Sequence, residues 1–153
     1  CGYTAQVGYG QEEAWFASVY TAEEDISLRA AGFYATGKNT EYEIYVVSDF
    51  TDKGSFKDRK YLCNGFLADA GYYTIDLPEE VLVEAGNDFA IVVKIMTEGA
   101  EFPVAIECPV EDLSENADMS DGRSYLSLQG TLWEHIEETK NYNICLKGYA
   151  DLQ

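Results

Sequence analysis

The stretch from Phe33 to Val47, FYATGKNTEYEIYVV, constrains the fold of this chain more than any other segment. Aromatic and β-branched residues lie on both sides of Gly37-Lys38-Asn39, which is the pattern of two strands joined by a short turn. Segments of the same character recur at Gly71 to Leu77, GYYTIDL, and at Phe89 to Ile95, FAIVVKI. The sequence therefore predicts a β-hairpin at 33–47 and an antiparallel β protein overall.

Alternating apolar and polar residues predict about ten strands, because successive side chains of a strand point to opposite faces. The segment 89–96 is nearly all apolar, so we expect it at the centre of a sheet, with Lys94 interrupting one face. Many short strands favour an all-β fold, a two-sheet antiparallel β-sandwich that is jelly-roll-like. The further predicted strands are Ala14–Thr21, Ile26–Ala35, Tyr61–Ala68, Pro103–Glu107, Ser124–Gly130, Thr131–Ile136 and Tyr142–Tyr149.

The strand after the first turn has two distinct faces, and other segments lack strand periodicity. In the strand after the first turn, Tyr42, Ile44 and Val46 are expected in the core, and the alternate positions 41, 43 and 45 on a partly solvated face. The polar segments 49–60 and 111–122 lack periodicity and are expected to be loops, the first with exposed phenylalanines. No segment carries a helical apolar stripe over three turns, and 134–141 could form one helical turn at most.

The chain is strongly acidic, with 28 Asp and Glu against 10 Lys and Arg and a formal net charge of −18. This charge repels nucleic-acid phosphates and anionic lipids, and no apolar run approaches the roughly 20 residues of a membrane-spanning helix. Neither nucleic-acid binding nor membrane insertion is expected. Since no Met opens the chain and no secretion signal is present, we expect 1–153 to be one domain excised from a larger secreted or cell-surface protein.

Four cysteines, Cys1, Cys63, Cys108 and Cys145, are widely spaced and form no CxxC pair. Because His135 is the only imidazole, a structural zinc site has little support. Two disulfides, in any of three pairings, are open in an oxidising compartment, and so are free thiols. Cys145 lies within a predicted strand, where a buried free thiol is the commoner interpretation.

The sequence contains no evident catalytic set. Cys–His or Ser–His catalysis would need His135, and there is no G-x-S-x-G elbow. A carboxylate pair such as Glu41 with Glu43, or Glu107 with a partner, could in principle hydrolyse glycosides, but carboxylates on strands commonly face solvent. We therefore expect a chain that is not itself an enzyme.

Sugar-binding surfaces use exposed aromatic rings that stack on the apolar face of a pyranose, beside carboxylates and amides that accept hydrogen bonds from hydroxyl groups. Trp133, which follows a turn, is the first candidate for such a ring. Each candidate ring is more commonly a packing residue than a ligand contact, and Trp15 is expected in the core. The predicted ligand-binding residues are Trp133, Tyr125, Phe50, Phe56 and Glu134.

A structural Ca²⁺ ion is a further prediction, because this cation is held by several oxygen ligands and the chain has acidic clusters between strands. None of the clusters matches an EF-hand, and acidic turns are common in any chain of this net charge. If the first and last parts of the sandwich lie side by side, Glu23 and Asp151 could share the ion. The predicted metal ligands are Glu23, Asp25, Asp118, Asp121 and Asp151.

Seven motifs follow one another across nearly the whole chain, and together they resemble a known family. They are VGYGQEEAWFASVYTA (7–22), LRAAGFYATGKNTEYEIYV (28–47), GYYTIDL (71–77), FAIVVK (89–94), FPVAIE (102–107), GRSYLSLQGTLWEHI (122–136) and NICLKGY (143–149). In this order they resemble the lectin-like domain that follows papain-type cysteine peptidases in clostridial and related secreted or cell-surface proteins. The chain departs from that family in lacking an aromatic-aspartate segment before Cys1 and in having Cys63 and Cys108.

The resemblance implies a jelly-roll-like sandwich without peptidase activity, joined to neighbouring domains and binding a glycan or cell-wall polysaccharide. The alternative is a structural spacer or adhesin stalk domain with no ligand of its own. The two differ in the surface that they require. A binding module needs an aromatic patch beside polar groups, and a spacer does not.

Overall fold

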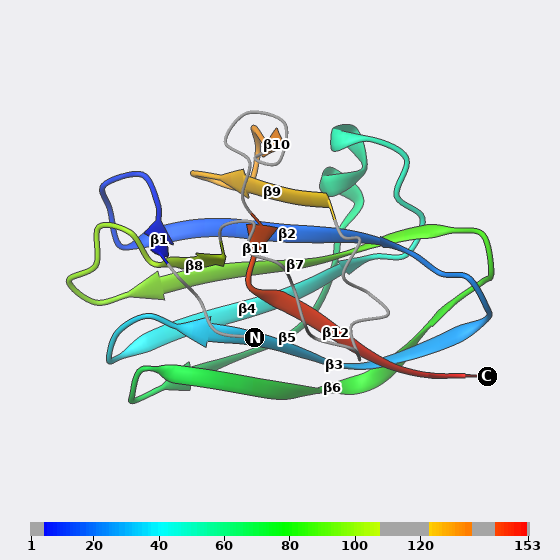
Figure 1. The fold of residues 1–153 in the computed structure, drawn as a ribbon, viewed down its shortest axis with the longest axis horizontal. Helices are drawn as coiled ribbons and strands as arrows, with labels where there is room; N and C mark the ends of the chain where they lie inside the picture. Colours follow the sequence, from blue (N-terminus) through cyan, green and yellow to red (C-terminus); the bar gives the residue numbers. More distant parts are fainter. Residues whose placement is uncertain (1–4, 108–122, 136–142, 153) are drawn as a thin grey trace.

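The computed structural model describes residues 5–107, 123–135 and 143–152. Two antiparallel sheets pack face to face, and a third, small sheet lies beside them (Figure 1). The predicted all-β antiparallel sandwich is confirmed. Among the described residues there is one short 3₁₀ helix, and none of the helical structure there is long and apolar enough to cross a membrane.

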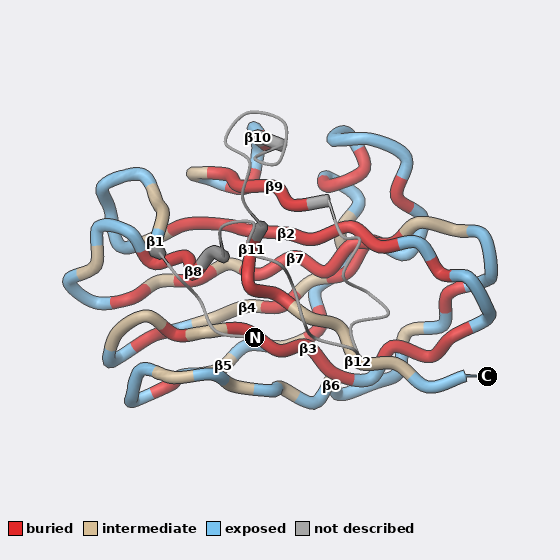
Figure 2. The backbone as a smooth tube through the Cα atoms, viewed as in Figure 1, coloured by how far each residue is buried: buried red, intermediate tan, exposed pale blue. Residues whose placement is uncertain are grey.

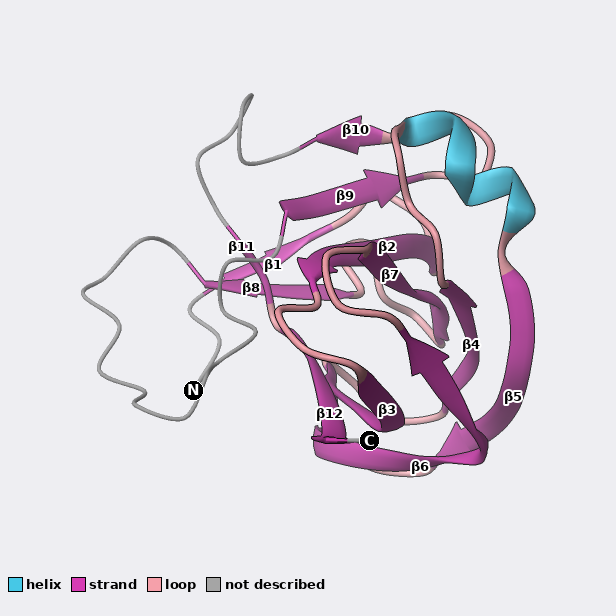
Figure 3. Ribbon diagram, turned by 90° about the vertical axis from the view of Figure 1, so that its right-hand side faces the viewer, coloured by secondary structure: helices cyan, strands magenta, loops and turns pink. Residues whose placement is uncertain are grey.

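The larger sheet has six strands in the order β10-β9-β2-β7-β4-β5. Strand β7 pairs with β2 on one side and β4 on the other, as expected of a nearly continuous apolar run. The sheet curves, so that its edge strand β5 approaches β6 of the opposite sheet (Figure 3). The strands are β2 (Glu13–Thr21), β4 (Thr40–Val47), β5 (Lys60–Leu67), β7 (Asp88–Thr97), β9 (Arg123–Ser127) and β10 (Glu134–His135).

The second sheet has the order β12-β3-β6, and the small third sheet has the order β1-β8-β11. The predicted single strand at 142–149 is divided at Cys145, because β11 pairs with β8 while β12 pairs with β3. The backbone N–H of Cys145 donates to the Ala105 carbonyl at 3.1 Å at this change of sheet. The strands are β3 (Ile26–Ala35), β6 (Gly71–Val83), β12 (Leu146–Leu152), β1 (Ala5–Val7), β8 (Val104–Glu107) and β11 (Asn143–Ile144).

The segment 33–47 forms two strands and a turn, but the predicted hairpin is wrong. Strand β3 pairs with β6 and β12, whereas β4 pairs with β5 and β7, so the chain crosses from one sheet to the other here. At the crossing, Asn39 has a φ of 56°, and its backbone N–H donates to the Ala68 carbonyl. Alternation does not distinguish a crossing from a hairpin, because each strand buries one face in either case.

The main core lies between the two large sheets, where β2, β3 and β7 are mostly buried and the edge strand β6 is mostly intermediate or exposed (Figure 2). Ile44 and Val46 lie in this core as predicted, and Tyr42 packs against it. The ring of Phe33, from the opposite sheet, has its centroid 5.4 Å from that of Tyr42. The face of β4 that the sequence predicts to be buried therefore packs against the opposite sheet.

Strand β3 contains a β-bulge between Leu28 and Ala30. Regular alternation would place Phe33 on the opposite face from Leu28, but the extra residue shifts the register, so both lie in the main core. Arg29, at the bulge, is exposed and lies 3.3 Å from the Asp151 carboxylate. Because of the bulge, the apolar side chains before it and those after it point into the same core.

The segment 49–60, predicted to be a loop, contains the 3₁₀ helix η1 (Lys53–Asp58). Asp52 and Ser55 form a capping box, in which the Asp52 carboxylate accepts the Gly54 backbone N–H at 2.8 Å. The expected exposure of Phe50 and Phe56 is wrong, because this local fold turns both rings onto the six-stranded sheet. The predicted loop at 111–122 and the positions 136–141 lie outside the described residues.

Candidate functional site

The outer face of the six-stranded sheet, which is turned away from the main core, has two halves. One half is covered by η1 and by the segment that leads into β10 (Figure 3). The other half, at the start of β2 and β4 and the end of β7, carries charged and polar residues.

Four predicted ligand-binding residues gather in the covered half with Trp15, and these five residues are called the aromatic cluster. Their exposed fractions lie between 1% and 7%, so the exposure that sugar stacking requires is absent. Phe56 stacks on Trp133 with ring centroids 4.3 Å apart, and its centroid lies 5.2 Å from that of Tyr125. Burial of Trp15 is confirmed, and the side chain of Glu134 lies outside the described residues. The cluster members are Trp15, Phe50, Phe56, Tyr125 and Trp133.

Arg59 lies at the border of the aromatic cluster, with its guanidinium over the Trp15 ring. Its guanidinium carbon lies 4.5 Å from the centre of the Trp15 ring, and its Nη1 donates to the carbonyls of Phe56 and Gly130, each at 3.0 Å. Gly130 has a φ of 78°, and a Cβ there would lie 2.8 Å from Cε2 of Trp15. These contacts tie η1 to the turn before β10 and explain why glycine occupies position 130.

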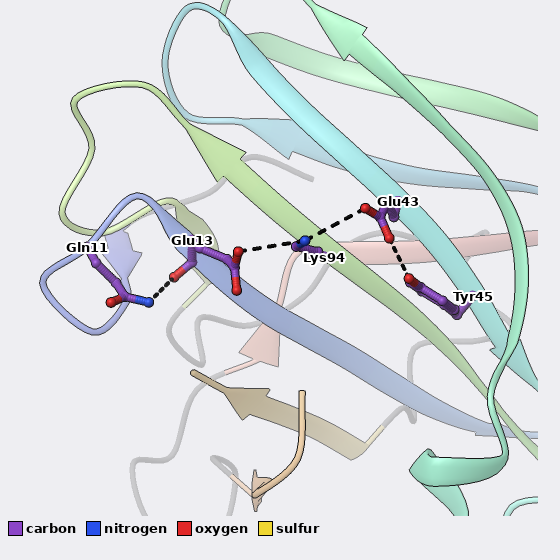
Figure 4. A network of polar contacts seen from close by, with 5 residues as sticks. All are labelled: Gln11, Glu13, Glu43, Tyr45 and Lys94. Carbon is purple, nitrogen blue, oxygen red and sulfur yellow. Dashed lines mark hydrogen bonds and ion pairs between the residues drawn. The ribbon is translucent and has the colours of Figure 1, made fainter. Parts of the chain in front are cut away.

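The uncovered half is called the open face. Lys94 of β7 stands between two carboxylates, with its Nζ 3.6 Å from Glu13 of β2 and 3.7 Å from Glu43 of β4 (Figure 4). The three residues are brought together by strand register, since Glu43 lies opposite Lys94 and Glu13 lies opposite the neighbouring Met96. The residues of the open face are Glu13, Glu41, Glu43, Asn64, Phe66, Lys94 and Met96.

Tyr45 lies at the boundary between the two halves. Its hydroxyl donates to the Glu43 carboxylate (Figure 4). Its ring centroid lies 5.5 Å from that of Trp15. Burial, together with the hydrogen bond to Glu43, raises the pKa of Tyr45 to about 12. The hydroxyl therefore stays protonated and remains a donor to Glu43 throughout the neutral pH range.

A cavity of about 390 Å³ lies over the open face. Phe66 of β5 is 59% exposed at its edge, and the Lys94 ammonium and the Glu43 carboxylate lie within it. Tyr42 and Gly65, which alternate with the outward-facing residues, complete the lining together with Glu41, Asn64 and Met96. An exposed ring, an amide, carboxylates and an ammonium group thus converge on one hollow.

A second cavity, of about 480 Å³, adjoins the first at Met96. The loops before β2 and after β7 and the turn after β9 line it, and the Glu12 carboxylate joins the two loops by accepting the Gly99 backbone N–H at 2.7 Å. The Gly10 backbone N–H also donates to the Glu101 carbonyl at 3.1 Å. Its lining residues are Gly10, Gln11, Glu12, Glu13, Met96, Gly99, Ala100 and Gln129.

The predicted metal ligands that the structure describes, Glu23, Asp25 and Asp151, form no metal-binding group. Across 5–107, 123–135 and 143–152, no group of three or more His, Cys, Asp or Glu side chains could hold a metal ion. The Asp25 carboxylate instead accepts the Ala85 backbone N–H at 2.8 Å, and Asp151 pairs with Arg29. Asp118 and Asp121 lie outside the described residues, as noted for 111–122, and Glu23 is exposed. Calcium therefore stays a prediction.

Two of the four cysteines, Cys63 and Cys145, lie among the described residues. Cys63 is a half-buried free thiol on the edge strand β5, and burial raises its pKa. Cys145 is buried between β11 and β12. Because Cys63 is a free thiol, the structure contains none of the three arrangements with two disulfides, and Cys1 and Cys108 lie outside the described residues.

A second group of aromatic residues, of which only Tyr72 is exposed, lies on the outer face of the β12-β3-β6 sheet. The hydroxyls of Tyr72 and Tyr149 are 2.7 Å apart, and the Tyr34 ring centroid lies 5.0 Å from that of Tyr72. A Cβ at Gly32 would lie 1.9 Å from the Tyr72 hydroxyl, so this side chain lies across the glycine. Burial and the Tyr149 hydrogen bond raise the pKa of Tyr72. We call Tyr34, Tyr72 and Tyr149 the tyrosine group.

The open face was not predicted as a site, although the sequence carried a signal for it. Lys94 is the single charged residue in an otherwise apolar strand, and Glu41 and Glu43 alternate with core residues of a neighbouring strand. What the sequence lacked was the strand order, because forty residues separate β4 from β7 and their pairing is not evident from either segment. Phe66 was indistinguishable from a core residue for the same reason.

The chemistry of the open face is that of polar recognition beside an exposed ring. Carboxylates and the Asn64 amide can accept hydrogen bonds from hydroxyl groups, Lys94 can donate, and Phe66 can stack against an apolar ring face. The tyrosine group provides rings, but the hydroxyls of Tyr72 and Tyr149 are hydrogen-bonded to each other. The open face combines hydrogen-bond acceptors, a donor and a stacking ring in one cavity.

Comparison with known proteins places this geometry in context. The sequence model of a family described as "Lectin like domain" matches residues 1–150. One similar solved structure contains the cysteine protease and lectin-like domains of Cwp84, a surface layer associated protein of Clostridium difficile, at 15% identity and a TM-score of 0.64. It aligns with 93% of this chain and 33% of that one.

A second similar structure is the clostridial cysteine protease Cwp84 after propeptide cleavage, at 16% identity and a TM-score of 0.65. The alignment covers 94% of this chain and 37% of that one. The chain thus spans about a third of the length of both structures. At these identities the likeness concerns the fold alone. No curated protein sequence gives a significant match.

Proposed function

The chain belongs to the lectin-like domain family, and from this premise we propose that it is a non-catalytic accessory module of a secreted or cell-surface protein. Its ligand is a carbohydrate or cell-wall polysaccharide. Its neighbours in the same protein include a cysteine peptidase domain, by analogy with Cwp84, which combines a cysteine protease with lectin-like domains. The activity of the whole protein is part of this proposal.

The observation that carries the proposal is the cavity over the open face. It joins the exposed Phe66 ring to hydrogen-bonding groups of both kinds, which is the combination that a pyranose requires. The cavity of about 390 Å³ also falls within the range of small-molecule sites, roughly 300–1,000 Å³. A spacer domain needs no such hollow, and it is the alternative if no glycan binds.

A glycan array with the purified chain tests the proposal. We expect binding to at least one plant, mucin or bacterial cell-wall glycan, and we expect Phe66→Ala to weaken it roughly fivefold, the factor for about 1 kcal/mol of stacking. Leu82→Ala is the matched control, because Leu82 is similarly exposed, at 64%, but lies on β6 of the other sheet. No binding across the array would favour the spacer alternative, and equal losses in both variants would place the site elsewhere.

Structural calcium is a separate part of the proposal and rests on the acidic composition alone. If the ion stabilises the native state, an excess of chelator lowers the melting temperature, and added Ca²⁺ restores it. An unchanged melting temperature would exclude a structural ion.

A further inference from the structure

The two cavities of the outer face form one continuous surface. Both are lined by Met96, which lies on β7 between Glu41 of β4 and Glu13 of β2. Glu41 in turn lies opposite Phe66 of the edge strand. Cross-strand neighbours share a face of the sheet, so these four residues form a row that runs perpendicular to the strands.

The length of this row sets the size of the ligand. It crosses β5, β4, β7 and β2, and three strand spacings amount to about 14 Å. Beyond Glu13, the second cavity continues to Gln129, which follows β9. A single sugar ring would occupy only the part near Phe66. Each sugar of a linear chain advances by about one strand spacing, so the row matches several sugars in sequence.

The charges of the row set the chemistry of the ligand. Four carboxylates line the two cavities, from Glu12, Glu13, Glu41 and Glu43, against the single ammonium of Lys94. Lys94 is already neutralised by the carboxylates on either side of it. The whole chain adds a net charge of −18 to this local excess. A ligand that carries carboxylate, sulfate or phosphate groups would be repelled.

We infer that the open face and its neighbouring cavity bind a linear oligosaccharide of at least three sugar units without acidic groups, lying across strands β5, β4, β7 and β2. This inference rests on the proposed carbohydrate-binding function and specifies its ligand class. The chain of sugars enters at Phe66, passes over Lys94 and Met96, and ends beside Gln129.

Isothermal titration calorimetry with defined oligomers tests the inference. The probes are linear oligomers of glucose, mannose and N-acetylglucosamine, each from one to five units, and oligogalacturonates of the same lengths. We expect at least one uncharged series to bind, with an affinity that rises at least tenfold between one and three units and then levels off. The oligogalacturonates are expected not to bind.

Variants at the two ends of the row distinguish a long ligand from a short one. Phe66→Ala and Gln129→Ala should each weaken binding of the four-unit oligomer by at least threefold, whereas Gln129→Ala should leave binding of the one-unit sugar unchanged. Leu132→Ala is the control, since Leu132 is 86% exposed close to Gln129 but lines neither cavity. Circular dichroism verifies that each variant is folded.

The outcomes separate this inference from the proposed function. Affinity that is independent of oligomer length, a preference for oligogalacturonates, or a lack of effect of Gln129→Ala on the longer oligomers would each overturn the inference while leaving carbohydrate binding intact. Failure of every uncharged series, with other glycans bound on the array, would also overturn it. A complete absence of array binding would instead reject the proposed function.

Discussion

The two halves of the outer face of the six-stranded sheet share the strands β2, β4 and β7, but their surfaces differ. In the covered half, five aromatic rings pack against one another and exclude solvent. In the open half, the same alternation of β2, β4 and β7 presents Glu43 and Lys94 to the first cavity and Glu13 to the second. The difference arises from a local segment, because η1 and the turn before β10 cover only one half.

This contrast shows that aromatic content alone does not identify a binding surface. The rings most suggestive of sugar stacking belong to a second, buried core in which Phe56 stacks on Trp133. Beside this core, Arg59 links η1 to the turn that contains Gly130 by donating to the carbonyls of Phe56 and Gly130. The residues suited to ligand contact lie beyond Trp15 and Tyr45, where the cover ends. Changes in the covered half should therefore affect stability, and changes in the open half should affect binding.

The largest expected effect is the loss of stability in Phe56→Ala. The ring is 1% exposed and stacks on Trp133, so its removal should lower the free energy of unfolding by about 3–5 kcal/mol, as for other buried phenylalanines. Urea denaturation measures the change. Phe66→Ala is the matched control and should lower it by less than about 1 kcal/mol. Similar losses in both variants would contradict the distinction between the halves.

The next effect concerns Gly130→Ala. A new Cβ would meet the Trp15 ring, and the positive φ adds backbone strain, so we expect a loss of about 2–4 kcal/mol in the free energy of unfolding. Gly86→Ala separates the two causes. Gly86 also has a positive φ, of 87°, but has open space around its Cβ position, so it should lose only about 1–2 kcal/mol. Equal losses would mean that the contact with Trp15 has no energetic role.

A smaller effect on stability, but a clear one on binding, is expected for Lys94→Met. Partly solvated ion pairs contribute about 0–1 kcal/mol, so denaturation should change little. Loss of a charged donor should weaken binding of the strongest array glycan about tenfold or more. The control is Lys60→Met on β5 of the same sheet, which removes an exposed ion pair with Glu79 of β6 in the opposite sheet. If glycan affinity survives in Lys94→Met, this lysine is not a ligand contact.

The smallest effect is a change in the alkaline part of the stability curve for Tyr45→Phe. The folded-state pKa of Tyr45 is about 12, above the ordinary 10.0, so the unfolded chain releases its proton first and stability falls as pH rises from 10 to 12. Tyr20, Tyr42 and Tyr72, whose pKa values are also raised, contribute to the same fall. Denaturation between pH 9 and 12 should therefore show a shallower fall for Tyr45→Phe, and parallel curves would rule out this contribution.

The sequence predicted the fold class and most strands because alternation and turn residues are local signals. It failed at 33–47, where the partners of β3 and β4 depend on the whole topology, and at 49–60, where η1 buries residues that a polar loop would expose. The open face was beyond prediction because Glu13, Glu43 and Lys94 meet only through strand pairing. The single charge of Lys94 within the apolar segment 89–96 was nevertheless a local signal for the open face.

An NMR titration of the ¹⁵N-labelled chain with the strongest glycan from the array would locate binding most directly. We expect backbone amide shifts at Glu41, Glu43, Phe66 and Lys94, and unchanged signals at Phe56 and Trp133. Shifts confined to the aromatic cluster, or to Tyr72 and Tyr149 of the tyrosine group, would contradict the assignment of binding to the open face.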